Sequence, residues 1–254
     1  IIPAYNEEKN ISKVLDRLEQ PEIAEFADIL VMNDASSDNT NWIVKARHHA
    51  VVTHVFNLGY GSALQLGYKY AIRCNYRYVI QMDADGQHDA GNLINLYRAL
   101  KTPDENGVYP DIVLGSRYLN DSPYFETSAL KRFAFFLFRH IIKWSTGRTI
   151  MDPTTGLQGL SRRAALCYSK FGNFDEKYPD ANMITNMLLS DFNIVEIPAA
   201  MHLREHGKSM HSGLKPIGYM FHMFFSILAV LIRQKIFKNV PKAERYNNDI
   251  QKTQ

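Results

Sequence analysis

The chain has 254 residues, of which 46% are hydrophobic and 22% are charged. This composition fits a folded domain with an ordinary core and excludes a disordered or fibrous protein. The net charge of +3 is too small to indicate a nucleic-acid-binding protein, so we expect no nucleic-acid partner. Two cysteines are too few for a disulfide framework or a zinc ribbon and favour a reducing compartment.

The charge is unevenly distributed along the chain. Residues 203–254 contain nine Lys or Arg and three Asp or Glu, so this part has a charge of +6 and residues 1–202 have −3. The first residues, Ile1-Ile2-Pro3, indicate part of a strand and not a secretory signal peptide. The C-terminal fifth is therefore the basic part of a nearly neutral chain.

Short apolar segments alternate with helical patterns over the first 120 residues. Strands are predicted at 28–33, 51–56, 78–82 and 111–115, and helices at 7–19, 38–49, 62–74 and 90–101. This alternation predicts an α/β fold in which helices flank a mostly parallel sheet. Ligands of such sheets lie beyond the carboxyl ends of the strands, so we expect the functional residues directly after them.

Two later segments combine apolar and basic residues. Residues 129–144 predict an aromatic-rich helix with one basic and one apolar stripe, formed by Arg132, Arg139 and Lys143 and by Phe133, Leu137, Ile141 and Trp144. A further strand is predicted at 193–202. Residues 216–232 lack formal charges and precede a basic stretch. Their length is at the lower limit of the roughly 17–25 residues that span a bilayer.

An acidic triplet follows the predicted strand at 78–82. Asp83 and Asp85 of Asp83-Ala84-Asp85-Gly86-Gln87 face the same side, because alternate residues of extended backbone do so. Two close carboxylates repel each other unless a cation is near, and hard oxygen ligands suit Mg²⁺ or Mn²⁺. A solvated acidic turn is the alternative. The position after a buried strand favours a metal site.

An ordered series of motifs extends over roughly residues 1–211. The motifs are PAYNEE (3–8), NDASSDNT (33–40), NLGYGSALQLG (57–67), DADGQHD (83–89), GSRY (115–118), TTGLQGLSRRA (154–164) and REHGKSMH (204–211). The series resembles family 2 glycosyltransferases, which have the GT-A fold, and most of all their dolichyl-phosphate mannosyltransferase and polyprenyl-phosphate glycosyltransferase branch. The resemblance implies an inverting sugar transfer from a nucleotide diphosphate sugar, assisted by Mg²⁺ or Mn²⁺.

The resemblance also implies roles for single residues of the donor site. The base and ribose would contact Pro3, Ala4, Tyr5, Glu7, Asp34, Asp83 and Ala84. The metal that bridges the diphosphate would be bound by Asp83, Asp85 and Gln87. Further donor contacts would come from Arg117 and, in a loop that closes over the donor, from Arg204, Lys208 and Ser209. The NLGYG segment lacks the lysine of a P-loop and is expected to form a tight turn with close backbone approach.

Two carboxylates are candidates for the acceptor side. Asp152 precedes the Thr-Gly segment, and Asp180 lies in a Tyr-Pro-Asp-Ala-Asn segment. A hydroxyl acceptor needs a carboxylate as general base, whereas an ionised lipid phosphate needs none. In the second case Asp152 would orient groups or assist metal binding. We favour Asp152 over Asp180.

These expectations combine into one functional hypothesis. Residues 1–213 would form a GT-A domain that transfers a sugar from a UDP- or GDP-sugar to a polyprenyl phosphate or lipid-linked saccharide, in cell-surface glycan synthesis. Residues 214–254, together with an interfacial helix at 129–144, would associate with the cytoplasmic face of the cell membrane. The rival interpretation of this apolar surface is an interface between copies of the chain in a homo-oligomer.

Three other functions compete with this hypothesis. The first is a polysaccharide-extending glycosyltransferase with a hydroxyl acceptor. The second is a sugar-nucleotide nucleotidyltransferase, which would need a glycine-rich loop where PAYNEE has no glycine. The third is a non-catalytic module that binds nucleotide or membrane, against which the four carboxylates Asp34, Asp83, Asp85 and Asp152 argue.

Overall fold

The computed structural model describes residues 1–119, 129–202, 215–236, 242–244 and 246–247. Its strands form two hydrogen-bonded groups. The first is parallel, in the order β1-β2-β3, with β1 (Ile2–Ala4), β2 (Leu30–Asn33) and β3 (Ala50–Thr53). The second has the order β4-β6-β5-β7, with β4 (Tyr78–Gln81), β6 (Gln158–Ser161), β5 (Ile112–Ser116) and β7 (Ile194–Pro198).

Two backbone hydrogen bonds connect these groups through β1 and β4. The Ile1 nitrogen donates to the Ile80 carbonyl (2.7 Å), and Met82 N–H donates to the Ile1 carbonyl (3.1 Å). In a parallel ladder, one residue forms hydrogen bonds with the two residues on either side of its partner in the next strand. Here Ile1 bonds to Ile80 and Met82, so β1 and β4 are parallel. Strand β6 runs antiparallel to both β4 and β5, and β7 runs parallel to β5. The predicted α/β fold with a mostly parallel sheet is confirmed, with β6 as an unpredicted antiparallel strand.

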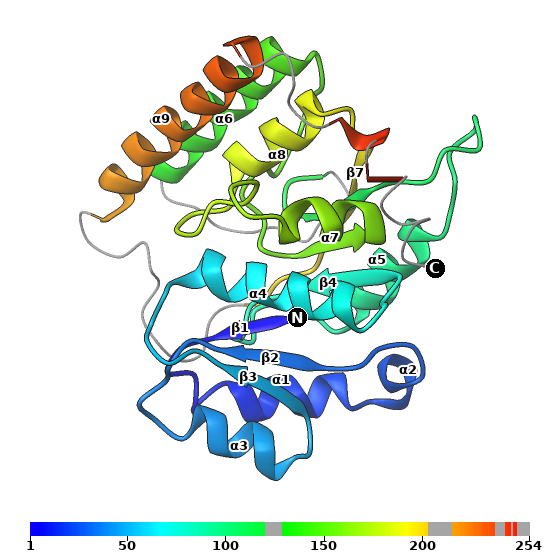
Figure 1. Ribbon diagram of the computed structural model, residues 1–254, viewed down its shortest axis with the longest axis vertical. Coiled ribbons are helices and arrows are strands. Elements are labelled where there is room, and N and C mark those ends of the chain that lie inside the picture. Colours follow the sequence, from blue (N-terminus) through cyan, green and yellow to red (C-terminus); the bar gives the residue numbers. More distant parts are fainter. Residues whose placement is uncertain (120–128, 203–214, 237–241, 245, 248–254) are drawn as a thin grey trace.

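Helices lie on both faces of the sheet. One apolar core lies under α1 (Ile11–Leu18), α2 (Pro21–Ala24), α3 (Thr40–Ala46) and α5 (Gly91–Leu100). The other core lies under α4 (Tyr60–Arg73), α7 (Arg162–Ser169), α6 (Ala129–Thr146), α8 (Ala181–Leu189) and α9 (Lys215–Ile236). All five predicted helices are present, the uncharged segment 216–232 is part of α9, and α2, α7 and α8 are additional. In Figure 1, α6 and α9 lie at one end of the molecule and α3 at the other.

Helix α6 packs on α8 and α9 through a face next to the predicted apolar stripe. Among the α6 side chains that the structure describes, those of Ala134, Phe138 and Ile142 are buried, and the side chain of Phe133 lies outside the described set. Of the predicted stripe, Leu137 and Ile141 are only half-buried and Trp144 is 78% exposed. One helical position turns a side chain by about 100°, so packing against α8 and α9 decides which of two neighbouring apolar rows is covered.

The C-terminal segment shares the core of the rest of the chain. Met223 and Ile227 of α9 are buried in the same cluster as Phe138 and Tyr168, and Tyr246 also belongs to it. Among the described residues, no helix combines the length and the apolar character that crossing a membrane requires.

Candidate active site

The carboxyl ends of four strands place the predicted donor residues at one edge of the sheet. Strands β1, β2, β4 and β5 end at Ala4, Asn33, Gln81 and Ser116. Tyr5, Asp34 and Arg117 follow directly, and Asp83 follows β4 after one intervening residue, Met82. These strands run in one direction, so their ends meet at one edge, as a doubly wound sheet requires.

Asp34 anchors the turn that leads into α4. Its carboxylate is buried and contacts the His54 ring nitrogen Nδ1 at 2.7 Å. It also accepts hydrogen bonds from Leu58 N–H (2.9 Å) and Gly59 N–H (2.8 Å). Gly59 has a φ of +97°, which a residue with a side chain rarely adopts. The expected tight turn of the NLGYG segment is therefore present, and Asp34 organises it.

The PAYNEE segment forms a turn against the segment that follows β2. Pro3 and Ala4 are buried in β1, whereas the Tyr5 side chain is half exposed. Glu7 N–H donates to Thr40 Oγ1 at 2.8 Å, and the Glu7 carboxylate accepts a hydrogen bond from Asn10 at 2.7 Å. Tyr5 is therefore the side chain of this segment most available to a ligand.

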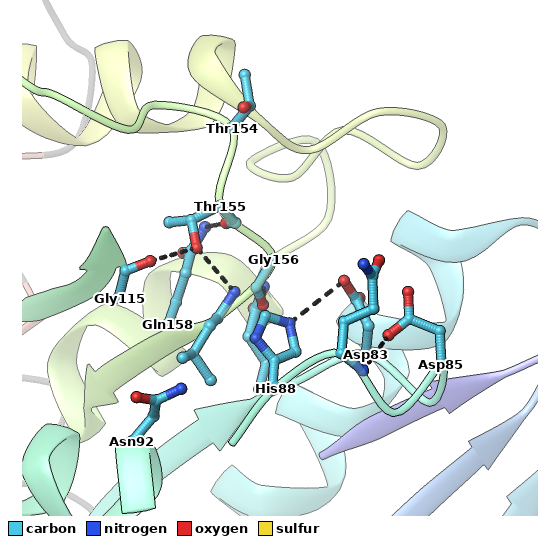
Figure 2. A network of polar contacts seen from close by, with 12 residues as sticks. Asp83, Asp85, His88, Asn92, Gly115, Thr154, Thr155, Gly156 and Gln158 are labelled. Carbon is cyan, nitrogen blue, oxygen red and sulfur yellow. Dashed lines mark hydrogen bonds and ion pairs between the residues drawn. The ribbon is translucent and has the colours of Figure 1, made fainter. Parts of the chain in front are cut away.

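Three segments enclose the Asp83 carboxylate. Tyr60, at the start of α4, donates to Asp83 Oδ1 at 3.0 Å. The buried His88 ring directs Nε2 toward Asp83 Oδ2 at 3.6 Å, as Figure 2 shows. On another side is Gly156, where an added Cβ would lie only 2.6 Å from Asp83 Oδ2. The position of Asp83 is therefore fixed by α4, by the turn after β4 and by the segment before β6.

Asp85 lies close to Asp83 in Figure 2, and Gln87 follows two residues later in the chain. Asp85 is buried, and its Oδ1 accepts a hydrogen bond from Gln87 N–H at 3.0 Å. The Gln87 side-chain amide donates to the His202 carbonyl (3.1 Å), and His202 N–H donates to the Gln87 carbonyl (2.7 Å). The acidic turn is thereby joined to the segment after β7. The predicted residues Arg204, Lys208 and Ser209 lie outside the described residues.

The donor set of this turn fits a divalent cation that a substrate completes. Within the described part of the chain, no group of three or more His, Cys, Asp or Glu is arranged to hold a metal by itself. Asp83, Asp85 and Gln87 offer carboxylate and amide oxygens. Mg²⁺ is commonly bound by one or two carboxylates together with substrate phosphates, so two carboxylates are sufficient on the protein side.

Asp152 is buried and paired with Arg117. Its carboxylate accepts hydrogen bonds from Arg117 N–H (3.0 Å), Nε (2.7 Å) and Nη2 (2.7 Å). Burial alone would lower the pKa of Arg117, but the charge of Asp152 and these hydrogen bonds raise it above its ordinary value. Glu196 of β7 holds the Asp152 turn by accepting from Met151 N–H (2.6 Å) and Asp152 N–H (2.8 Å).

Two arginines flank the ring of Tyr118. The Arg117 guanidinium carbon lies 5.5 Å from the ring centroid, and that of Arg139, on α6, lies 5.1 Å from it. Arg139 Nε is buried without a hydrogen-bond partner in the described part of the structure. A buried guanidinium N–H normally has an acceptor, so this N–H is an unsatisfied donor beside the Tyr118 ring.

Asp180 lies close enough to Arg117 and Asp83 to interact electrostatically with both. Tyr219 of α9 donates to Asp180 Oδ2 at 2.8 Å. Burial raises the pKa of Asp180 to about 7, the Tyr219 hydrogen bond opposes this rise, and the charge of Asp83 adds to it. The opposite charge of Arg117 acts in the lowering direction. Asp180 is thus a carboxyl group that can exchange a proton near neutral pH.

Several residues of the site were not predicted from the sequence. Tyr60 and His88 lie inside the NLGYG and DADGQHD motifs, so the motifs themselves could have identified them. Glu196 and Tyr219 lie in an apolar strand and an apolar helix, and only the fold reveals their direction toward the site. Arg139 was predicted solely as part of a basic stripe.

The fold resembles that of a solved glycosyltransferase. Glucosyl-3-phosphoglycerate synthase from Mycobacterium tuberculosis, in complex with Mn²⁺, uridine-diphosphate-glucose and phosphoglyceric acid, matches with a TM-score of 0.63 and 19% identity. The match covers 91% of this chain and 78% of that chain. At this identity the likeness concerns the fold, and it supports the predicted α/β fold of the GT-A type.

Sequence relatives include transferases named for polyprenyl phosphates. An uncharacterised protein of Methanocaldococcus jannaschii is 28% identical over 93% of this chain and 91% of its own length. UDP-N-acetylglucosamine–dolichyl-phosphate N-acetylglucosaminyltransferase of Methanococcus voltae is 26% identical, over 65% of this chain and 69% of its own. Undecaprenyl-phosphate mannosyltransferase of Micrococcus luteus is 34% identical, over 46% of each chain.

The family model for glycosyl transferase family 2 matches residues 1–168. This match includes every strand end that forms the donor side of the site, from β1 to β5, and the Asp152 turn. The relatives that transfer sugars to dolichyl or undecaprenyl phosphate agree with the predicted polyprenyl-phosphate branch. The chain belongs to glycosyltransferase family 2.

Proposed function

We propose that this chain is a metal-dependent, inverting glycosyltransferase that moves a sugar from a UDP- or GDP-sugar to a polyprenyl phosphate or lipid-linked saccharide. The observation that supports this is the electrostatic proximity of Asp83 to both Arg117 and Asp180, which brings a proposed donor group close to the proposed acceptor groups. The names of the relatives support a polyprenyl-phosphate acceptor. Membership of family 2 argues against a nucleotidyltransferase.

On the donor side, the residues hold the nucleotide and its diphosphate. Tyr5 and Glu7 would contact the base and ribose, with backbone groups of Pro3, Ala4 and Ala84 nearby and Asp34 fixing the adjacent turn. Asp83, Asp85 and Gln87 would hold Mg²⁺ or Mn²⁺, whose charge stabilises the leaving diphosphate. Arg204, Lys208 and Ser209 remain proposed as further phosphate contacts.

Arg117, which the sequence predicted as a donor contact, is proposed on the acceptor side, where it would bind the lipid phosphate together with Arg139. Both guanidinium groups lie near the Tyr118 ring, and charged guanidinium N–H groups form strong hydrogen bonds to phosphate oxygens. Asp152 already uses its oxygens on Arg117, so we propose that it orients this arginine. The acceptor phosphate would then lie between the two arginines.

Asp180 is the carboxylate that we propose as proton acceptor, in place of Asp152. Its pKa of about 7 suits a general base at neutral pH, as efficient proton transfer requires. A hydroxyl acceptor must lose a proton when it attacks. A phosphate monoester, with a second pKa of about 6, also retains a proton in part of its population. Asp180 would accept the proton in either case.

The outer face of α6 and α9 is the proposed membrane surface, at the cytoplasmic leaflet. Neither helix contains Asp or Glu. Exposed apolar residues follow one another along α9 and recur on α6, namely Phe221, Phe224, Phe225, Leu228, Ile232, Ile236, Phe136 and Trp144. Arg132 and Lys143 of α6 are also exposed. An apolar surface without acidic groups and with basic neighbours favours anionic lipid.

The central test is the Asp85→Asn variant, assayed with Mn²⁺, a panel of UDP- and GDP-sugars and polyprenyl phosphate in liposomes. Loss of one anionic ligand should reduce metal-dependent transfer by about a hundredfold or more, with the thermal unfolding midpoint retained. Asp104→Asn, which changes an exposed carboxylate far along the chain from the turn, is the matched control. Full activity of Asp85→Asn would contradict the metal assignment. Transfer to a saccharide hydroxyl alone would identify a polysaccharide-extending enzyme.

A further inference from the structure

We propose that Tyr219 of α9 is a positioning residue for Asp180, so that the helix on the proposed membrane surface also fixes the acceptor-side carboxylate. The inference rests on the proposed function, because Asp180 is given the role of proton acceptor there. The Tyr219 hydroxyl donates to Asp180 Oδ2 at 2.8 Å, from an element that lies outside the matched family region. The hydroxyl therefore connects α9 directly to the site.

The Tyr219 ring is held on two sides, which fixes the direction of its hydroxyl. Its centroid lies 5.4 Å from that of Tyr178, with the planes at 85°. It lies 6.5 Å from Phe138 of α6, with the planes at 81°. Edge-to-face contacts of this kind are specific in geometry and add to the apolar burial of the rings. The ring is therefore a rigid support for the hydrogen bond to Asp180.

A second hydroxyl on the same face of α9 contacts the segment that contains Asp180. Ser226 lies about two helical turns after Tyr219. Its Oγ accepts a hydrogen bond from the Asn182 side chain (2.7 Å) and donates to Asp175 Oδ2 (3.3 Å). The exposed Phe221 and Phe225 lie on other faces of the helix. One face of α9 thus holds residues 175–182, while another faces outward.

The same segment is packed against the donor side. Ser62 N–H, in the first turn of α4, donates to the Glu176 carbonyl at 3.2 Å. Gly61 approaches so closely that an added Cβ would lie 2.1 Å from the Asp175 carbonyl oxygen. The neighbouring Tyr60 donates to Asp83. Residues 175–182 therefore lie between α9 and the acidic turn, so the placement of α9 fixes Asp180 relative to Asp83.

The test is a double-mutant cycle on the full chain with donor, Mn²⁺ and polyprenyl phosphate in liposomes. Tyr219→Phe keeps the ring and removes the hydroxyl, so we expect kcat to fall by about tenfold to a hundredfold with the KM for the donor unchanged. In the Asp180→Asn background the same change should have no further effect, because Tyr219 acts through Asp180. Thermal unfolding of each variant reports whether the fold is retained.

Ser226→Ala is the matched control, because it removes another hydroxyl by which α9 contacts the same segment. We expect its kcat to remain within about twofold of the wild type, because Asp175 still accepts hydrogen bonds from the Asn182 side chain and from two backbone N–H groups of the segment. An equal loss in Ser226→Ala, an unchanged kcat in Tyr219→Phe, or additive effects in the cycle would overturn the role of Tyr219. Full activity of Asp180→Asn would instead contradict the proposed role of Asp180, which separates failure of this inference from failure of the proposed function.

Discussion

At the scale of single residues, the space around the Asp83 carboxylate depends on the absence of a side chain at Gly156. Asp83 Oδ1 is held by Tyr60, and Oδ2 lies near His88 and the Gly156 backbone. Figure 2 shows Gly156 beside His88, on the side of Asp83 that His88 also faces. Closely packed protein atoms do not accommodate an extra methyl group unless a neighbouring atom moves.

Gly156→Ala should therefore displace Asp83 without unfolding the chain. The Cβ would lie 2.6 Å from Asp83 Oδ2, and the carboxylate is the group able to move. We expect the affinity for Mn²⁺ with a nucleoside diphosphate to fall by about tenfold, since a shift of a ligand by a fraction of an ångström lowers metal affinity. Calorimetric titration measures this. Gly218→Ala, where nothing lies within 4 Å, should bind normally. Equal affinities of both variants would refute the crowding argument.

The raised pKa of the half-buried Asp180 predicts a pH dependence of stability in the protein without ligand. Its pKa is raised from 3.8 to about 7, chiefly by burial. Between these pH values the folded state retains a proton that the unfolded chain releases. The contribution of Asp180 to the free energy of unfolding is therefore greatest at acid pH. It falls as the pH rises through this interval, by about 1.4 kcal/mol per unit at most.

Asp180→Asn removes this titration and keeps the shape of the side chain. Relative to wild type, we expect the variant to gain about 2–3 kcal/mol in the free energy of unfolding between pH 5 and pH 8. Urea denaturation at both pH values measures the difference. Glu22→Gln, which changes an exposed carboxyl on α2, should show no such gain. A constant difference between Asp180→Asn and wild type across this range would exclude a raised pKa.

Among the elements, apolar periodicity predicted those that have a strong pattern. Strands β2, β4 and β5 and helices α4 and α5 occur within a few residues of their predicted positions. Strand β6 (Gln158–Ser161) contains Gln, Gly and Ser, so no apolar run marks it. It is stabilised by its place between β4 and β5, which the local sequence does not encode.

In the site, too, some features follow from local sequence patterns and others from tertiary contacts. The acidic triplet after β4 is visible in the sequence, but its geometry is not the extended one that was expected, because Ala84 and Asp85 lie in a turn. The different surroundings of Asp152 and Asp180 could not be predicted, since Arg117 and Tyr219 reach these carboxylates from distant parts of the chain. Tertiary contacts therefore determine that Asp152 is paired with an arginine and that Asp180 has a raised pKa.

At the scale of the whole molecule, the site lies between two ends of different character. The end with α3 is distant in Figure 1 from the end with α6 and α9. The latter has no acidic residue in either helix and exposes aromatic side chains. In the proposed function, a lipid-linked acceptor would reach Arg117 and Asp180 from that end, whereas the donor would enter at the strand ends of β1, β2 and β4. This orientation would separate a water-soluble donor from a membrane-bound acceptor.

The orientation predicts the effect of charges placed on α9. Phe221 and Phe225 are each about 60% exposed, so the double variant Phe221→Asp/Phe225→Asp should fold normally. It should lower partition onto anionic liposomes by about a hundredfold, through lost apolar burial and repulsion from the lipid headgroups. Flotation measures partition. Trp42→Asp, at an equally exposed aromatic of α3, should float as wild type does. The contrary result has two parts: the wild type is dimeric and does not bind liposomes, and the double variant is monomeric. This result would show that the face joins two copies of the chain.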